Sequence, residues 1–149
     1  MNLNEKGAKL MHDFEGLKLT SYLCPAKVWT IGYGNTFYED GSKVQAGQNI
    51  SKTRAVQLFN NIVEKSFAEP VRKLLKVELN DNQFSALVSF AYNVGMANIG
   101  KSTLLKKVNI NPNDPTIASE FMKWNKAGGK ELKGLTNRRI AESKLYYAK

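Results

Sequence analysis

Residues 15–36 of the chain read EGLKLTSYLCPAKVWTIGYGNT, and this stretch decides the fold. Apolar residues at helical spacing precede this stretch, and strand-type residues lie within it, most densely over 28–34. A turn signal at 39–41 (EDG) comes before further strand-type residues. The stretch therefore predicts that a first helix, with Asn4 as its N-cap, leads into a small antiparallel sheet of two or three strands.

Helical spacing returns after residue 50 and persists to the end of the chain. Ser51 is a good N-cap for one helix, and Asn80 with Gln83 forms a capping-box pattern at the start of another. Asp114, followed by a proline, predicts the start of a third helix, and Thr136 predicts the start of the last one. The pattern predicts an α+β fold with two lobes, a small antiparallel sheet lobe and a larger helical lobe.

The length of 149 residues predicts one domain, 1–149, with a β-rich lobe at about 15–50 and a helical lobe at about 51–149 that includes the N-terminal helix. The single cysteine excludes an internal disulfide, and one cysteine with one histidine excludes a Cys/His zinc cluster. No apolar run approaches the roughly 18 residues of a membrane span. The first residues carry no secretory signal, so we expect the chain to stay in the cytosol where it is made.

The formal net charge of +9 is the unusual bulk property. Residues 123–149 contribute eight Lys or Arg against two Glu. Such an excess favours an anionic partner, which can be nucleic acid, an acidic polymer or a negatively charged cell envelope. Charge alone does not choose among these partners.

Glu15 is the first candidate for chemistry, because it lies at the predicted junction of helix and sheet, immediately before Gly16. A carboxylate at such a junction can face a groove between two lobes. On its own the feature is weak, since a glutamate at a helix end is usually solvated surface. The residues around it carry the argument further.

The segment resembles the phage-type lysozymes, glycoside hydrolase family 24. The family signature is a Glu, eight residues, an Asp or Cys, five residues, and a Thr that opens T-I-G-x-G; Glu15, Cys24 and Thr30 match it. The segment 79–95 resembles the central buried helix of the family, with 102–105 following. The segment 134–139 resembles its C-terminal G-L-x-x-R-R block. The resemblance covers nearly the whole chain and implies the lysozyme-like two-lobed fold.

The resemblance implies hydrolysis of the β-1,4 bond between N-acetylmuramic acid and N-acetylglucosamine in peptidoglycan, in a cleft between the lobes. Glu15 is then the general acid that protonates the leaving oxygen, and the hydroxyl of Thr30 helps to hold the attacking water. Cys24 replaces the usual second carboxylate, and its role stays open between nucleophile, base and polar wall for the water. This chemistry needs no metal and no organic cofactor.

The remaining site residues also come from the resemblance. Arg138 is expected to pair with Glu15, whereas Arg139 next to it is expected at the surface. His12 matches no family motif and is also expected at the surface. Asn93 and Trp124 match positions that support the glutamate from behind. Three residues match groove-lining positions that contact substrate, namely Thr36, Tyr92 and Thr103.

Three other functions compete with glycan hydrolysis. A nucleic-acid-binding module would explain the charge, but the chain has no recognition signature and we expect no nucleic acid as partner. The last helix has the mixture of basic and apolar residues that an envelope-disrupting helix would need. Packing of the apolar residues in the core explains the same mixture more simply. A lytic transglycosylase works with one Glu and differs from a hydrolase by its anhydro product.

The family also implies a biological setting. The chain is expected to be a monomeric phage endolysin that acts on peptidoglycan glycan strands and meets an anionic cell envelope. Without an export signal, it would wait in the host cytoplasm until a holin releases it to the periplasm and wall.

Overall fold

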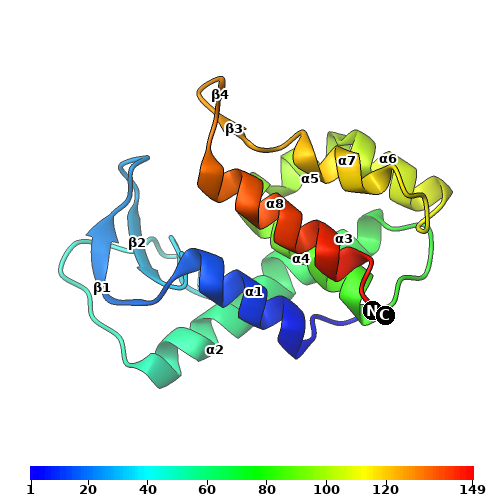
Figure 1. Cartoon of the computed structure of the whole chain (residues 1–149). Helices are drawn as coiled ribbons and strands as arrows, with labels where there is room; N and C mark the ends of the chain where they lie inside the picture. The colour runs from blue at the N-terminus through cyan, green and yellow to red at the C-terminus, as the bar shows by residue number, and fades with distance from the viewer. The chain divides into compact units, whose positions relative to one another are not determined.

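A computed structural model describes residues 1–149. Its elements in chain order are α1 (Glu5–Glu15), β1 (Lys18–Leu23), β2 (Trp29–Gly32), α2 (Lys52–Val63), the π-helical turn η1 (Glu64–Ala68), α3 (Glu69–Leu74), α4 (Asp81–Val94), α5 (Met96–Lys101), α6 (Thr103–Ile110), α7 (Ile117–Met122), β3 (Lys126–Ala127), β4 (Lys130–Glu131) and α8 (Lys133–Tyr146) (Figure 1). The predicted α+β class is confirmed. No helix is both long and apolar enough to cross a membrane.

The chain forms two compact units that are interleaved in sequence. Unit 1 contains Met1–Leu10 and Phe67–Lys149, and unit 2 contains Met11–Ser66. The sheet therefore shares its unit with α2 and with the last turn of α1, so unit 2 extends beyond the range 15–50.

Unit 2 is built on the antiparallel hairpin of β1 and β2, in which Leu23 pairs with Trp29 and Tyr22 with Thr30. A bridge between Phe37 and Lys43 extends the strand-like region across the predicted turn at 39–41. The Ser51 side chain accepts a hydrogen bond from the Arg54 backbone N–H at 3.0 Å and so caps α2 as predicted. The buried face of α2 packs against β2.

Unit 1 is centred on α4, whose middle is buried on all sides. The predicted capping box is present: the Asn80 side chain accepts from the Gln83 backbone, and the Gln83 side chain accepts from the Asn80 backbone. Helix α8 packs along α4 (Figure 1). The buried aromatic residues Phe90, Phe121 and Tyr146 form part of the core between these helices and α7.

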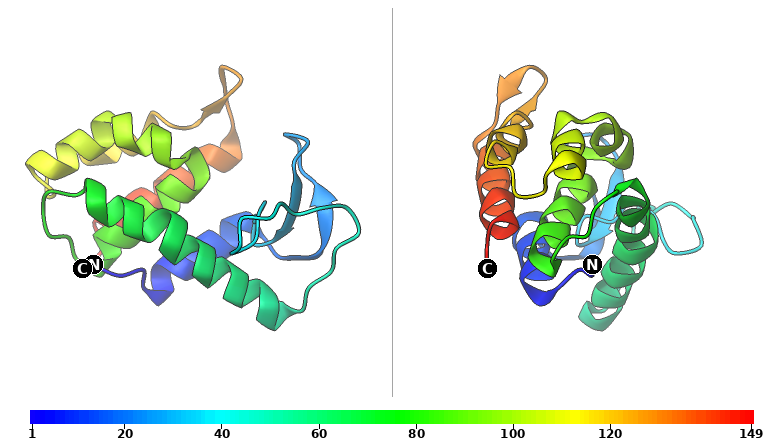
Figure 2. Two further views of the ribbon diagram at one scale, coloured as in Figure 1. Left: turned by 180° about the vertical axis from the view of Figure 1, so that it is seen from behind. Right: turned by 90° about the vertical axis from the view of Figure 1, so that its right-hand side faces the viewer.

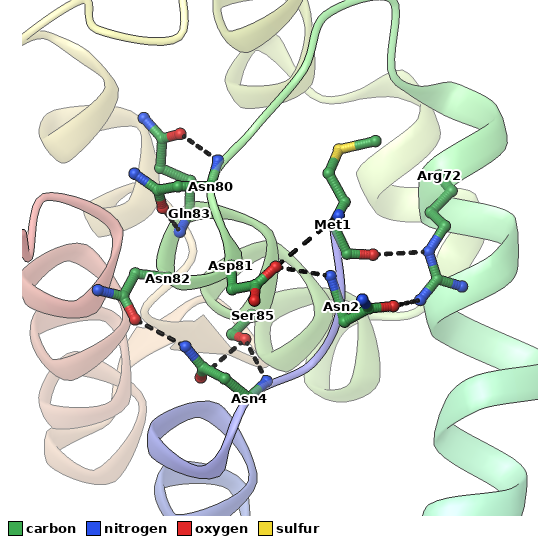
Figure 3. A network of polar contacts seen from close by, with 9 residues as sticks. All are labelled: Met1, Asn2, Asn4, Arg72, Asn80, Asp81, Asn82, Gln83 and Ser85. Atoms are coloured by element: carbon green, nitrogen blue, oxygen red, sulfur yellow. Dashed lines mark hydrogen bonds and ion pairs between the residues drawn. The ribbon is translucent and has the colours of Figure 1, made fainter.

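The first residues of unit 1 are bound to α3 and α4 by a polar network (Figure 3). The Asn4 side chain caps α1 by accepting from the Gly7 backbone at 3.0 Å, as predicted. The Asn2 backbone donates to Asp81, and Arg72 donates to the Met1 carbonyl at 2.9 Å. The Asn82 side chain accepts from the Asn4 amide and donates to the Ala148 carbonyl, so one residue joins segments near both termini.

The helical run from residue 52 to residue 74 widens into the π-helical turn η1 just before Pro70. A proline has no N–H to donate, and its ring clashes with the carbonyl four residues earlier, so a regular α-turn cannot form there. A π-turn relieves this conflict. The division between the two units falls inside the same turn.

Two predicted helix starts were wrong. Helix α7 begins at Ile117 rather than beside Asp114, because the Asp114 side chain accepts from the backbone and the hydroxyl of Thr116 and forms a local turn. Helix α8 begins at Lys133, three residues before Thr136, with Leu132 at a cap that has no side-chain hydrogen bond. The short hairpin β3–β4 was not predicted (Figure 2).

Candidate active site

Glu15 is the last residue of α1 and is half-buried. The helix ends there because Gly16 takes a φ of +72°, a left-handed conformation that favours glycine, and its N–H donates to the His12 carbonyl at 2.9 Å. The Glu15 carboxyl fills the space that a Cβ on Gly34 would occupy, and Gly34 also has a positive φ of +76°. The second glycine of T-I-G-x-G therefore admits the carboxyl to its position.

Cys24 begins the loop that joins β1 to β2 and is half-buried. Its N–H donates to the Val28 carbonyl at 3.1 Å, and its carbonyl accepts from Lys27 at 2.8 Å. Lys27 adopts a left-handed φ of +62°, so the loop is held tightly. Hydrogen bonds to the thiol from the backbone of Val28 and Ala26 and from the side chain of Thr30 lower its pKa from the ordinary 9.0, although burial opposes them.

Thr30 lies on β2 beneath this loop and is buried. Its hydroxyl donates to the Val28 carbonyl at 2.9 Å. A hydroxyl has one proton to give, so donation to Val28 and donation to the Cys24 sulfur are alternatives. The structure thus brings Cys24 and Thr30 together, as the family spacing predicts.

Tyr22, a half-buried residue of β1, is a neighbour of the predicted site that the sequence analysis did not name. Burial raises the pKa of its hydroxyl, and the negative charges of Cys24 and Glu15 raise it further. Both predicted catalytic groups therefore lie within electrostatic reach of one phenol. The available signal was its position two residues before Cys24, near the end of the strand that leads into the loop.

His12 was predicted at the surface, but the residue is half-buried on α1. Its ring stacks on Tyr33 with centroids 3.9 Å apart, and its Nε2 is buried without a hydrogen-bond partner. The reason is the position of His12 on α1, one turn before Glu15, where the helix packs against the turn that follows β2.

Arg139 was also predicted at the surface, and this was wrong, because the residue is fully buried in unit 1. Its Nε lies 2.8 Å from Glu142 Oε1, and the buried Arg138 places its own Nε 3.2 Å from Glu142 Oε2. Ser89 Oγ donates to the same carboxylate at 2.6 Å. Burial raises the pKa of Glu142 and lowers that of Arg139, while their opposite charges act against both shifts.

Asn93, which is exposed, and Trp124, which is half-buried, border this buried cluster. The Asn93 side chain accepts from Arg139 Nη2 at 2.7 Å, and the Trp124 carbonyl lies 3.4 Å from Nη1. Both residues also line a surface cavity of about 350 Å³, together with Asn98, Lys126 and Leu135. Their predicted role as support is consistent with contact to Arg139, whereas the pairing of Arg138 with Glu15 stays a prediction.

The three predicted groove residues lie in different parts of the two units. Thr36 is half-buried in unit 2, and its carbonyl accepts from Val44 at 3.0 Å. Tyr92 is half-buried on α4 and packs its ring on Phe67 at 5.0 Å. Thr103 is exposed at the first position of α6. Contact of these residues with substrate stays a prediction.

Known proteins share both the sequence and the fold. Residues 12–142 match the family model described as phage lysozyme. The endolysin of Bacillus phage B103 is 44% identical over 148 residues, which cover 98% of this chain and 54% of that protein, so the chain spans about half the length of this relative. The endolysin of Escherichia coli O157:H7 phage FAHEc1 superposes with a TM-score of 0.88 and 38% identity, over 99% of this chain and 94% of that one. The muramidase domain of SpmX from Asticaccaulis excentricus superposes with a TM-score of 0.87 and 30% identity, over 99% of both chains.

Proposed function

Because the chain belongs to the phage lysozyme family, we propose that it is an endolysin that hydrolyses the β-1,4 bond between N-acetylmuramic acid and N-acetylglucosamine in peptidoglycan. The observation that carries the proposal is that the Glu15 carboxyl lies against Gly34 of T-I-G-x-G. It is supported by the closeness of Cys24 to Thr30, the residue that opens the same motif. A muramidase domain among the structural neighbours supports the choice of bond.

Glu15 is the general acid in this proposal. Cleavage of a glycosidic bond needs a proton for the leaving oxygen, and the opposite face of the sugar needs a nucleophile or a group that positions water. The Glu15 carboxyl is half-buried against Gly34, where a bound glycosidic oxygen can take its proton directly. General-acid catalysis of this kind contributes about 10²- to 10⁴-fold to the rate.

Cys24 and Thr30 form the water side of the proposed reaction. The two residues are neighbours across the hairpin loop, and the Thr30 hydroxyl can turn from the Val28 carbonyl toward another acceptor. Together they offer a sulfur and a hydroxyl that can bind one water molecule. In this proposal Cys24 shapes the water site and does not form a covalent bond to the sugar.

Arg138 supports the acid in this proposal. Glu142 and Ser89 hold its guanidinium in place, and the planar group presents several N–H donors in a fixed geometry. We assign the Glu15 carboxylate as its further partner. The glycan strand is then bound by Thr36, Tyr92 and Thr103.

The cellular setting follows the same proposal. A monomeric, basic enzyme would meet the anionic envelope after a holin opens the inner membrane, having waited in the host cytoplasm.

The test compares wild type with Glu15→Gln in a turbidity assay on chloroform-permeabilised Gram-negative cells. Glutamine fills the same space but has no proton to give, so lysis should fall at least about 10²-fold while the melting temperature stays near that of wild type. Lys133→Ala, an exposed change on α8, serves as the control and should lyse normally. More than a tenth of wild-type activity in Glu15→Gln would show that Glu15 is not the acid.

A lytic transglycosylase is the second candidate, and the absence of a carboxylate at position 24 favours it. Mass spectrometry of digested peptidoglycan separates the two reactions. Reducing muramic ends identify the hydrolase that we propose, and anhydro ends identify the transglycosylase.

A further inference from the structure

Three rings join the last turn of α1 to the turn after β2 and to α2, all within unit 2. The His12 imidazole stacks on Tyr33, with ring centroids 3.9 Å apart and planes 11° from parallel. The Phe59 ring meets both at steep angles, with centroids at 4.4 Å from His12 and 5.6 Å from Tyr33. Tyr33 and Phe59 are buried and His12 is half-buried, so this ring cluster lies at the edge of the core of unit 2.

The same helical turn carries Glu15. Residues three apart on a helix share a face, so His12 and Glu15 both project toward the turn after β2. His12 contacts Tyr33, and the Glu15 carboxyl contacts the next residue, Gly34. Two adjacent contacts thus fix α1 to this turn, one through the rings and one through the carboxyl.

A histidine is unusual at position 12, because its ring packs against two other rings and its polar nitrogen finds no partner there. Its Nε2 is buried and unpartnered, although a buried polar group without a hydrogen bond lowers stability. Burial lowers the pKa of His12 below 6.5, and the charge of Asp13 on the same helix acts in the opposite direction. The other elements packed on the ring present the phenol of Tyr33 and the uncharged ring of Phe59. The stack is therefore made of two neutral rings near neutral pH.

We propose that His12 is a positioning residue whose stack on Tyr33 holds the Glu15 carboxyl against Gly34. The proposal rests on the role of Glu15 as the acid. A proton on His12 places a charge at the unsolvated Nε2, which breaks the neutral stack and loosens the last turn of α1 from Tyr33. The Glu15 carboxyl then leaves its place, so catalysis fails as the pH falls, before unit 2 unfolds.

The experiment uses His12→Ala, which removes the ring, and His12→Phe, which keeps a neutral ring. Val44→Ala, a buried change in unit 2 outside the ring cluster, is the matched control for lost packing. We expect His12→Ala to lower kcat about tenfold or more with KM within twofold, because small misplacements of a catalytic group are costly. We expect His12→Phe to restore most of kcat and to stay active at lower pH than wild type, and Val44→Ala to lower only the melting temperature. If the activities of wild type and His12→Phe fall over the same pH range on the acid side, the proposal is overturned, even if His12→Ala fails to fold.

A second measurement separates this proposal from the assignment of Glu15. The Glu15 carboxyl resonance is followed by ¹³C NMR of the full chain at one fixed pH. His12→Ala should shift this resonance, whereas Val44→Ala should not. A shift in His12→Ala with an active Glu15→Gln would support positioning and remove Glu15 as the acid. An inactive Glu15→Gln with a wild-type resonance and kcat in His12→Ala would refute positioning alone.

Discussion

The Glu15 carboxyl occupies the volume in which the Cβ of any side chain at position 34 would lie, and Gly34 leaves that volume free. The glycine is therefore required both by its left-handed backbone and by its neighbour. A residue with any side chain at position 34 would have to displace the carboxyl.

Gly34→Ala should accordingly lower activity much more than stability. The left-handed backbone costs alanine about 1–2 kcal/mol, and a displacement of the acid by about 1 Å can cost about 10²-fold in rate. Gly41→Ala is the matched control, since Gly41 has a φ of +87° and open space around it. Turbidity assays and melting temperatures should show similar destabilisation in both variants and a loss of lysis only in Gly34→Ala.

Arg139→Ala should destabilise the protein by about 3–5 kcal/mol, because it leaves the buried Glu142 with one partner fewer and opens space beside Phe90. The free energy of unfolding in urea measures the effect. The exposed change Lys133→Ala should stay within about 0.5 kcal/mol of wild type. A free energy of unfolding as high in Arg139→Ala as in that control would contradict the buried ion pair.

Cys24→Ser should remain active within about tenfold of wild type, since a hydroxyl can take over the hydrogen bonds that shape a water site. Cys24→Asp should keep or raise activity, because a carboxylate opposite the acid is the usual glycosidase arrangement. Rates on permeabilised cells test both. If the serine variant is as inactive as Glu15→Gln, the thiolate is a nucleophile, because an unactivated hydroxyl is a far weaker one.

Glu39 should make the stability of unit 2 sensitive to acid. Its two carboxylate oxygens accept from Arg54 at 2.6 and 2.7 Å, and Arg54 with Asn61 lowers the pKa of Glu39 from 4.5 to about 2. A lowered folded-state pKa means that the ionised group stabilises the fold above about pH 4.5 and that this contribution disappears as the pH falls toward 2. The pair is partly exposed, so the contribution is about 1 kcal/mol or less.

Thermal unfolding of wild type and Glu39→Gln at several pH values provides the check. The two proteins should differ at pH 7 and converge near pH 2. A constant difference across this range would mean that the pair does not titrate as described.

Elements with local signals were the ones that the sequence predicted well. Ser51 and the pair Asn80 and Gln83 satisfy backbone groups of their own helices, so their meaning does not depend on distant residues. Helix α8 begins at a residue without any side-chain cap, and β3–β4 has only two residues per strand. Neither leaves a pattern long enough to detect.

The site residues divide in the same way. The convergence of Cys24 with Thr30 followed from spacing, because a short hairpin loop separates them. The burial of Arg139 depends on Glu142, which lies three residues further on and also serves Arg138 at a separation of four. The sequence shows this spacing, but it does not show which face of α8 packs against α4. The ring cluster of His12 depends on contacts with β2 and α2 that no local pattern shows.

The order of the two units along the chain bears on protein engineering. Unit 1 is assembled from the two ends of the sequence, with the whole of 11–66 between them, and Asn82 binds Asn4 and Ala148 at once. A circular permutant that starts at Phe67 and joins the old termini by a linker would make unit 1 one unbroken stretch, followed by unit 2. It would remove a loop closure whose entropy is on the order of 3 kcal/mol, so each unit could be expressed, labelled and unfolded as a contiguous segment.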